Sequence, residues 1–331
     1  MVYFLIMIDL IFPFHRDDRH LREAVTSLTL VEGHKLRMII VDDRIDQSLN
    51  LRELFTGFGT YEYINTIGGV GYGECLRLAS EVLTSEIVAL MNSDDLIRSD
   101  RFLKQASMLE TAEIATSRML RIDHRGKNVP SILGEISGPD YHPIFLLLGA
   151  YGANATWCTR LEWWKTNVFF DGNQCLDWRV AFNSFNHSKI SYTSEPLYFY
   201  RKHRNQVTAV KNIYQDNFSE LYDEWRKFCK LITGREFSRD VFNLFAVPWN
   251  KNSSIADQEF LDFKKFIADK IVEINVRLTP DMESLLNRRG LLALRKTNNT
   301  LTSAKIISTS CNAILPLASD FIVSAAHQAF H

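Results

Sequence analysis

Apolar runs alternate with amphipathic segments through the first third of the chain. Residues 6–12, 37–41 and 86–91 are almost continuously apolar, which is typical of parallel strands covered on both faces. Between them, residues 21–28 and 72–83 carry apolar side chains at helical spacing. This alternation of strands and helices predicts an open α/β sheet.

Two residues set expected boundaries within this pattern. Pro13 should end the first strand, because it has no backbone N–H to donate. Ser99 is the expected N-cap of a helix over residues 99–109. Further strands are expected over residues 61–65 and 112–120.

Polar residues follow three of the expected strands. Pro13–His15, Asp42–Asp43 and Asn92–Asp95 each come directly after an apolar run. Ligands of open α/β sheets bind beyond the carboxyl ends of the strands. We therefore expect these three clusters to share one rim of the sheet.

The pattern changes after Pro130, where Trp, Phe and Gly become frequent and the periodicity is less regular. From Gln215 onward the apolar positions read as helices. We expect a domain over residues 1–214, with halves of about 1–125 and 126–214, followed by a helical region over residues 215–331.

Composition narrows the class of protein. The chain of 331 residues has a formal net charge of -1, so nothing in the balance calls for nucleic acid. Its five cysteines form no CxxC pair, which argues against a disulfide framework or a zinc site. The apolar N-terminus lacks a basic segment and a cleavage site, so a first strand is favoured over a signal peptide. No apolar run approaches the ~20 residues of a membrane span, and we expect a cytoplasmic location.

Glycines at positions 68, 69, 71 and 73 precede one of the expected helices. They do not form GxGxxG, since the position three after Gly71 is Glu74, and a nicotinamide site is disfavoured. Two interpretations stay open: a turn that packs closely, or a loop that approaches a phosphate or a sugar.

The NSDD segment, Asn92 to Asp95, also has two interpretations. Acids after a strand commonly cap the next helix. Alternatively, a carboxylate at a strand end can bind Mg²⁺ or Mn²⁺, whose coordination shell is completed by substrate phosphates and water. Asp94 fits that second role.

Six segments, taken in order, resemble glycosyltransferase family two, the inverting transferases of GT-A fold. The resemblance covers residues Ile6 to Thr208. The segments are IDLIFPFHRDDRHLREAVTSL, IIVDDRID, GGVGYGECLRLA, VALMNSDDLI, CLDWRVAF and EPLYFYRKHRNQVT. The resemblance implies a Rossmann-like nucleotide-sugar half over about residues 1–125 and an acceptor half over about 126–214.

The resemblance also implies roles for individual residues. Asp43 matches the acid that reads the base or ribose, Asp94 the last acid of the DxD motif, and Asp177 the catalytic acid of an "ED" pair. Arg201 and His203 match a "YRxH" segment near the donor phosphates. The implied nucleotide-sugar contacts are Pro13, Phe14, His15, Asp43, Gly71, Ser93, Asp94, Asp95, Arg201 and His203, and the implied metal ligands are Asp94, Asn92 and His203.

The chain departs from the family pattern at several positions. His15 replaces the usual Asn, Arg44 and Ile45 replace Gly-Ser, and Leu176 replaces the Glu before Asp177. Asn92 stands where the first Asp of DxD is usual, and a neutral amide gives the metal one charge less.

Transfer of a sugar to a hydroxyl needs a carboxylate that accepts the proton, and Asp177 is the candidate general base. Metal on Asp94, with Arg201 or His203, would stabilise the departing diphosphate. Trp157 and Trp178 are candidates for stacking on acceptor sugars, with a place in the core as the alternative.

The resulting hypothesis is an inverting, metal-dependent hexosyltransferase that uses a UDP-sugar and a saccharide or lipid-linked glycan acceptor. The resemblance sets it in bacterial surface polysaccharide assembly, such as lipopolysaccharide or capsule. The alternative is a catalytically silent, nucleotide-sugar-binding scaffold subunit. The basic and apolar C-terminal helices would contact the membrane surface or a second subunit, or pack on the catalytic domain.

Overall fold

The structure is a computed structural model that describes residues 6–16, 19–46, 50–129, 143–148, 153–168, 176–203, 213–245 and 257–273. Within these residues, nine strands form one sheet of order β3-β2-β1-β4-β8-β6-β9-β5, with β7 paired to β6. The strands are β1 Met7–Phe14, β2 Lys35–Asp42, β3 Thr60–Asn65, β4 Ile87–Leu90, β5 Leu96–Ile97, β6 Ile114–Ile122, β7 Asn128–Val129, β8 Cys158–Arg160 and β9 Ile190–Arg201.

Parallel and antiparallel pairs divide the sheet into two parts. β1 pairs in parallel with β2 and β4, and β2 pairs in parallel with β3. β8 is antiparallel to both β4 and β6, while β6 is parallel to β9. The predicted α/β fold is confirmed, and the strands with continuous apolar runs, β1, β2 and β4, are almost completely buried.

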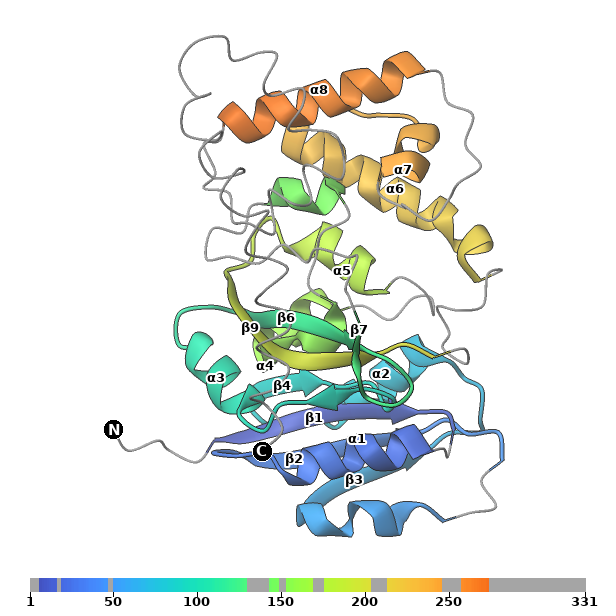
Figure 1. The fold of residues 1–331 in the computed structure, drawn as a ribbon, viewed down its shortest axis with the longest axis vertical. Helices are drawn as coiled ribbons and strands as arrows, with labels where there is room; N and C mark the ends of the chain where they lie inside the picture. The colour runs from blue at the N-terminus through green and yellow to red at the C-terminus, as the bar shows by residue number, and fades with distance from the viewer. Residues whose placement is uncertain are drawn as a thin grey trace.

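Helices cover both faces of the sheet and extend beyond it (Figure 1). The α-helices are α1 Arg19–Thr29, α2 Tyr72–Glu81, α3 Arg101–Met108, α4 Leu161–Asn167, α5 Leu176–Ser184, α6 Ile213–Thr233, α7 Arg239–Phe245 and α8 Asp257–Glu273, and the 3-10 helices are η1 Arg52–Phe58, η2 Pro143–Leu148 and η3 Asn154–Thr156. None of the helices in the described ranges is long and apolar enough to cross a membrane.

Two hydrophobic clusters lie on opposite faces of the sheet, because successive side chains of a strand point to opposite faces. In β1, Ile11 belongs to the cluster with α2, α4, α5 and α6, whereas Leu10 and Phe12 belong to the cluster with α1, η1 and α3. α6 continues the first cluster away from the sheet, with the Phe182 and Phe228 rings 5.3 Å apart. The domain boundary near Gln215 stays a prediction.

Two predicted boundaries are wrong. β1 runs through Pro13, which pairs with Val41 of β2. Pro13 lies past the last residue pair between β1 and β4, Ile11 with Leu90, so its missing N–H costs no bond to β4. The third helix begins at Arg101 with Asp100 at the N-cap position, and the Ser99 hydroxyl instead donates to Glu32 at 2.6 Å.

Candidate active site

The carboxyl ends of β1, β2 and β4 lie side by side. The Asp43 N–H donates to the Phe14 carbonyl at 2.8 Å, and the Met91 N–H donates to the Ile11 carbonyl at 3.1 Å. The three polar clusters after these strands therefore lie along one rim, as the sequence predicted. At this rim the Pro13 and Phe14 side chains are buried and His15 is exposed.

The Asp43 carboxylate holds the glycine turn that leads into α2. It accepts hydrogen bonds from the Thr66 hydroxyl at 2.7 Å, the Val70 N–H at 2.9 Å and the Gly71 N–H at 3.1 Å. This set fixes the backbone before Tyr72, the first residue of α2. The predicted contact of Asp43 with a base or ribose stays a prediction.

Gly68 supports the interpretation of the glycines as a closely packed turn. Its φ is +85°, and an added Cβ would lie 2.8 Å from both the Arg44 carbonyl oxygen and the Ile45 Cα. Only glycine tolerates this conformation together with so close a backbone approach. Gly68 therefore serves close packing of the turn against the segment after β2, and a sugar contact at Gly71 stays a prediction.

A second acid at the end of β2 is part of a buried ion pair. Asp42 accepts hydrogen bonds from Arg44 Nε at 2.8 Å, Arg44 Nη2 at 2.7 Å and the Tyr63 hydroxyl at 2.7 Å. Burial opposes ionisation of Asp42, but these hydrogen bonds outweigh it and lower its pKa below the ordinary value. Arg44 also lies 5.6 Å from the centroid of the Phe14 ring. The arginine that replaces the family's usual glycine thus stabilises the rim.

The NSDD segment forms a turn whose last acid is fully buried. Asp95 accepts hydrogen bonds from the Tyr198 hydroxyl at 2.6 Å, the Arg201 N–H at 2.7 Å and the Asn92 amide at 3.2 Å. Burial and the charge of neighbouring Asp94 raise the pKa of Asp95 well above its ordinary value. Asp95 therefore joins the end of β4 to the end of β9 and does not cap a helix, and its predicted contact with the donor stays a prediction. Ser93 is partly exposed in the same turn.

Asp94 and His203 meet at the open side of this turn. Asp94 Oδ2 lies 2.9 Å from His203 Nε2, with side-chain exposures of 29% and 11%. The His203 ring lies 5.0 Å from the His20 ring of α1. The two predicted donor contacts at Asp94 and His203 are therefore placed together.

Arg201 is a buried contact of the NSDD turn. Its side chain is fully buried, its Nε donates to the Asp94 carbonyl at 2.8 Å, and its Nη2 lies 2.7 Å from Glu23 Oε2 of α1. The guanidinium lies behind the turn, where it fixes the Asp94 backbone. The predicted contact of Arg201 with a donor phosphate stays a prediction.

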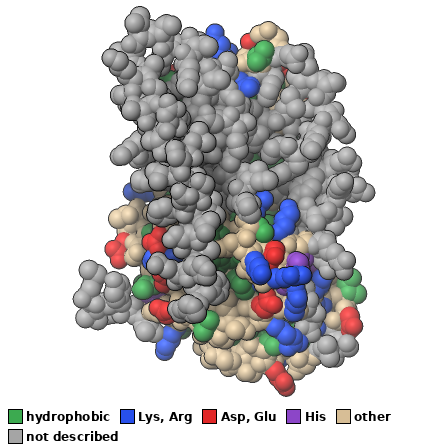
Figure 2. All heavy atoms as spheres, viewed as in Figure 1, with side chains coloured by type: hydrophobic (Ala, Val, Ile, Leu, Met, Phe, Trp, Pro, Cys, Tyr) green, Lys and Arg blue, Asp and Glu red, His purple; other side chains and the backbone are tan. Residues whose placement is uncertain are grey.

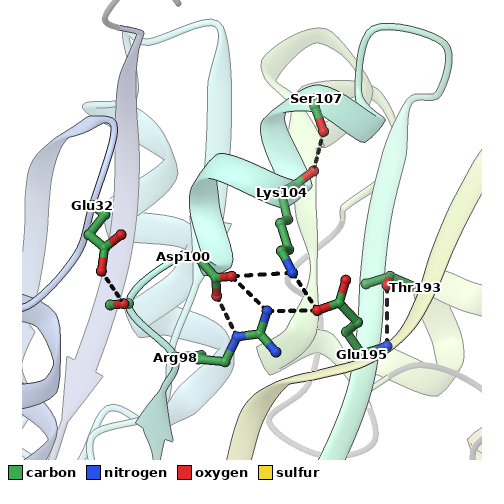
Figure 3. Close-up of polar contacts among 8 residues, drawn as sticks. Glu32, Arg98, Asp100, Lys104, Ser107, Thr193 and Glu195 are labelled. Carbon is green, nitrogen blue, oxygen red and sulfur yellow. Dashed lines mark hydrogen bonds and ion pairs between the residues drawn. The ribbon is translucent and has the colours of Figure 1, made fainter.

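An external ion-pair network holds β9 against α3 (Figure 3). Arg98 binds Asp100 at 2.5 Å and Glu195 of β9 at 2.8 Å. Lys104 of α3 binds Asp100 at 3.2 Å and also pairs with Glu195. The network therefore ties α3 and the residues just before it to β9.

Asp94 and His203 form a pair of ligands that a divalent cation can use. Mg²⁺ or Mn²⁺ commonly takes one or two protein ligands and completes its shell with substrate phosphates and water. Neighbouring ligands of an octahedral ion with bonds of about 2.1 Å lie roughly 3 Å apart, comparable with the observed 2.9 Å. In the described part of the chain, no group of three or more His, Cys, Asp or Glu residues is placed to hold a metal ion. The Asn92 amide nitrogen is bonded to Asp95.

Asp177 lies in the first turn of α5, near the end of β4. A small cavity with mostly apolar walls has Asp177 and Asn154 as its polar lining residues and also touches Leu90, the last residue of β4. The Asn154 amide donates to the Tyr72 hydroxyl at 3.1 Å. Burial and the charge of Asp177 raise the pKa of Tyr72 above its ordinary value. Asp177, which is partly exposed, thus lies close to the hydrogen-bonded pair of Asn154 and Tyr72.

The two candidate acceptor-stacking tryptophans pack in the core. Trp157 is 2% exposed and lies 5.6 Å from the Phe185 ring, and Trp178 is 9% exposed and lies 5.4 Å from the Phe182 ring. Stacking on a sugar needs an open ring face, which neither has. The packing favours the core alternative for both.

Sequence reasoning missed Glu23, Tyr198, Tyr72 and Asn154. Glu23 lies on the exposed side of α1, and Tyr198 lies within a strand, so neither residue differs from an ordinary surface or core position in the local pattern. Tyr72 follows directly on the glycine turn, which was the one available signal that its position is special.

Comparison with models of protein families assigns the chain to a family. The model of Glycosyl transferase family 2 matches residues 9–186, which is more than half of the 331 residues. The chain therefore belongs to this family and is a glycosyltransferase, as its motif order predicted. Comparison with curated proteins found no match.

Solved structures with a similar fold include those of S. aureus TarS. TarS 1–349 in complex with UDP-GlcNAc has a TM-score of 0.59 and 15% identity, over 80% of this chain and 81% of that one. TarS 1–349 in complex with UDP has a TM-score of 0.56 and 16% identity, over 89% and 93% of the two chains. At these identities the likeness shows the fold alone, and it agrees with the GT-A arrangement.

Proposed function

We propose that this glycosyltransferase moves a sugar, with inversion, from a UDP-sugar to a hydroxyl of a saccharide or lipid-linked glycan. The observation that carries the proposal is the Asp94–His203 pair, 2.9 Å apart, at the same end of β4 as Asp177. The Asp94–His203 pair offers ligands for a diphosphate-bound cation, and Asp177 offers a proton acceptor. TarS, of similar fold, binds UDP and UDP-GlcNAc.

In the proposed reaction the acceptor hydroxyl attacks the anomeric carbon from the face opposite the leaving group. The bond from this carbon to the diphosphate oxygen breaks, and its electron pair stays on the diphosphate. The acceptor proton passes to the Asp177 carboxylate. General base catalysis of this kind contributes on the order of 10²- to 10⁴-fold to the rate.

Mg²⁺ or Mn²⁺, held by Asp94 and His203, would supply positive charge to the departing diphosphate. Exposed arginines near the rim, Arg16, Arg19 and Arg22, favour an anionic donor. Figure 2 shows Lys and Arg side chains gathered beside a histidine on the α/β half.

The family resemblance also supports a setting. We propose assembly of a bacterial surface polysaccharide at the cytoplasmic face of the membrane. Contact of the C-terminal helices with the membrane surface or a second subunit belongs to the same proposal.

The proposal is tested by UDP release from a panel of UDP-sugars in Mn²⁺, with and without saccharide acceptors. We expect metal-dependent UDP release that an acceptor accelerates. Binding of UDP-sugars without turnover on any acceptor would favour the scaffold alternative. Binding of NAD instead of UDP would contradict both.

A further inference from the structure

Tyr72 and Asn154 form a polar pair beside the proposed general base. The Asn154 amide of η3 donates to the Tyr72 hydroxyl of α2 at 3.1 Å, and both side chains are partly exposed. They come from elements 82 residues apart in the chain. The turn before Tyr72 is fixed by Asp43 through the Gly71 N–H, so the tyrosine is carried by a rigid backbone.

The direction of this hydrogen bond leaves the Tyr72 proton for another acceptor. A phenol is one donor and one acceptor, and here the amide N–H occupies the acceptor side. The ring packs against the hydrophobic cluster around α2 and α5, which limits its rotation. Burial, followed by the negative charge of Asp177, raises the pKa of the hydroxyl and keeps it protonated. Tyr72 is therefore a fixed hydrogen-bond donor.

The Tyr72–Asn154 pair lies near both the proposed general base, Asp177, and the NSDD turn. Asn154 and Asp177 line the same cavity above Leu90, and the NSDD turn follows Leu90 within two residues. The transferred sugar must lie between the diphosphate and the base that activates the acceptor. That sugar carries hydroxyl oxygens that can accept a hydrogen bond.

We propose that the Tyr72 hydroxyl donates a hydrogen bond to a hydroxyl of the transferred sugar, and that Asn154 positions the tyrosine for it. Tyr72 is thereby a specificity-determining residue that favours donors with an oxygen at that position. The inference rests on the proposed function, because it requires a UDP-sugar at this rim.

The test compares the affinities of UDP and of UDP-sugars, by calorimetry in Mn²⁺ with UDP, UDP-glucose and UDP-N-acetylglucosamine. Tyr72→Phe should weaken the better UDP-sugar by about 3- to 10-fold, the range for one neutral hydrogen bond, and leave UDP unchanged. Asn154→Ala should shift the same ratio by a smaller factor. Tyr222→Phe is the matched control, because the Tyr222 hydroxyl donates to the Phe237 carbonyl at 2.9 Å within the same cluster.

The outcomes separate the two proposals. If the wild-type protein binds none of the three ligands, the proposed function fails. If it binds UDP and the UDP-sugars but Tyr72→Phe leaves the affinity ratio unchanged, or weakens UDP equally, the role of Tyr72 is overturned while the function stands.

Discussion

Asp95 Oδ1 accepts a hydrogen bond of 2.7 Å from the backbone N–H of Arg201, a residue 106 positions later in the chain. This bond joins the turn after β4 to the end of β9. Asp94 and His203 lie within two residues of Asp95 and Arg201, which this bond joins. The bond therefore determines whether Asp94 and His203 meet. A structural acid thus sets the geometry of the proposed metal ligands.

Asp95→Ala should destabilise the fold strongly. The substitution leaves the Tyr198 hydroxyl and the Arg201 N–H buried without their acceptor, at a cost of about 2 to 5 kcal/mol. Urea unfolding measures this loss. Asp100→Ala is the control, because a partly exposed ion pair contributes at most about 1 kcal/mol. Equal losses in the two variants would show that Asp95 is not the anchor described here.

Asp94→Ala should weaken UDP binding more in Mn²⁺ than in EDTA. Loss of one charge-assisted contact of about 1.5 to 3 kcal/mol corresponds to a decrease on the order of 10-fold or more. Asp123→Ala is the control, since Asp123 accepts from the Arg125 and Lys127 N–H groups of its own turn. Titration with UDP in both buffers checks the prediction, and equal losses with and without metal would mean that Asp94 is not a ligand.

Gly68→Ala should destabilise more than Gly59→Ala, although both glycines have positive φ. At Gly59 a Cβ meets nothing within 4 Å, so only the left-handed conformation costs energy, about 1 to 2 kcal/mol. At Gly68 the Cβ also meets backbone atoms at 2.8 Å, and we expect a loss of about 2 to 4 kcal/mol in total. Thermal or urea unfolding of the two variants decides. Similar losses would show that the turn does not depend on close packing.

Asp100→Asn should lower stability at neutral pH, with an effect that fades in acid. Hydrogen bonds from Arg98 lower the pKa of Asp100 to about 2. A carboxyl with a depressed pKa contributes stability above its ordinary pKa, which is lost as the pH falls toward the folded-state value. Because Asp100 is 26% exposed, we expect at most about 1 kcal/mol at pH 7. Urea unfolding at about pH 7, 5 and 3 follows this difference, and a constant difference would contradict the ion-pair explanation.

The first four strands and the shared rim could be predicted from the sequence, because each depends on a local pattern. Continuous apolar runs predicted β1, β2 and β4, and the parallel pairing of these strands places Asp43 and Asp94 at one edge. The boundary at Pro13 could not be predicted locally, since it depends on where β4 stops pairing with β1.

The roles within the site depended on contacts between distant segments. The motif match assigned the ligand role to Asp94, but no local pattern shows that Asp95 is buried, which depends on the approach of Tyr198 and Arg201. The same approach buries Arg201, which the family motif suggested as a phosphate contact. Tryptophan is a residue type typical of sugar-binding sites, but neighbouring aromatic rings cover Trp157.

Single-turnover transfer by Asp177→Asn tests the central claim most directly. The amide keeps the shape of Asp177 but cannot accept the acceptor proton, so we expect transfer to fall about 10²- to 10⁴-fold, with UDP affinity within about 2-fold of wild type. Asp223→Asn is the matched control, because Asp223 is an exposed acid of α6 near Arg226, and it should transfer at the wild-type rate. Wild-type transfer by Asp177→Asn would contradict the account.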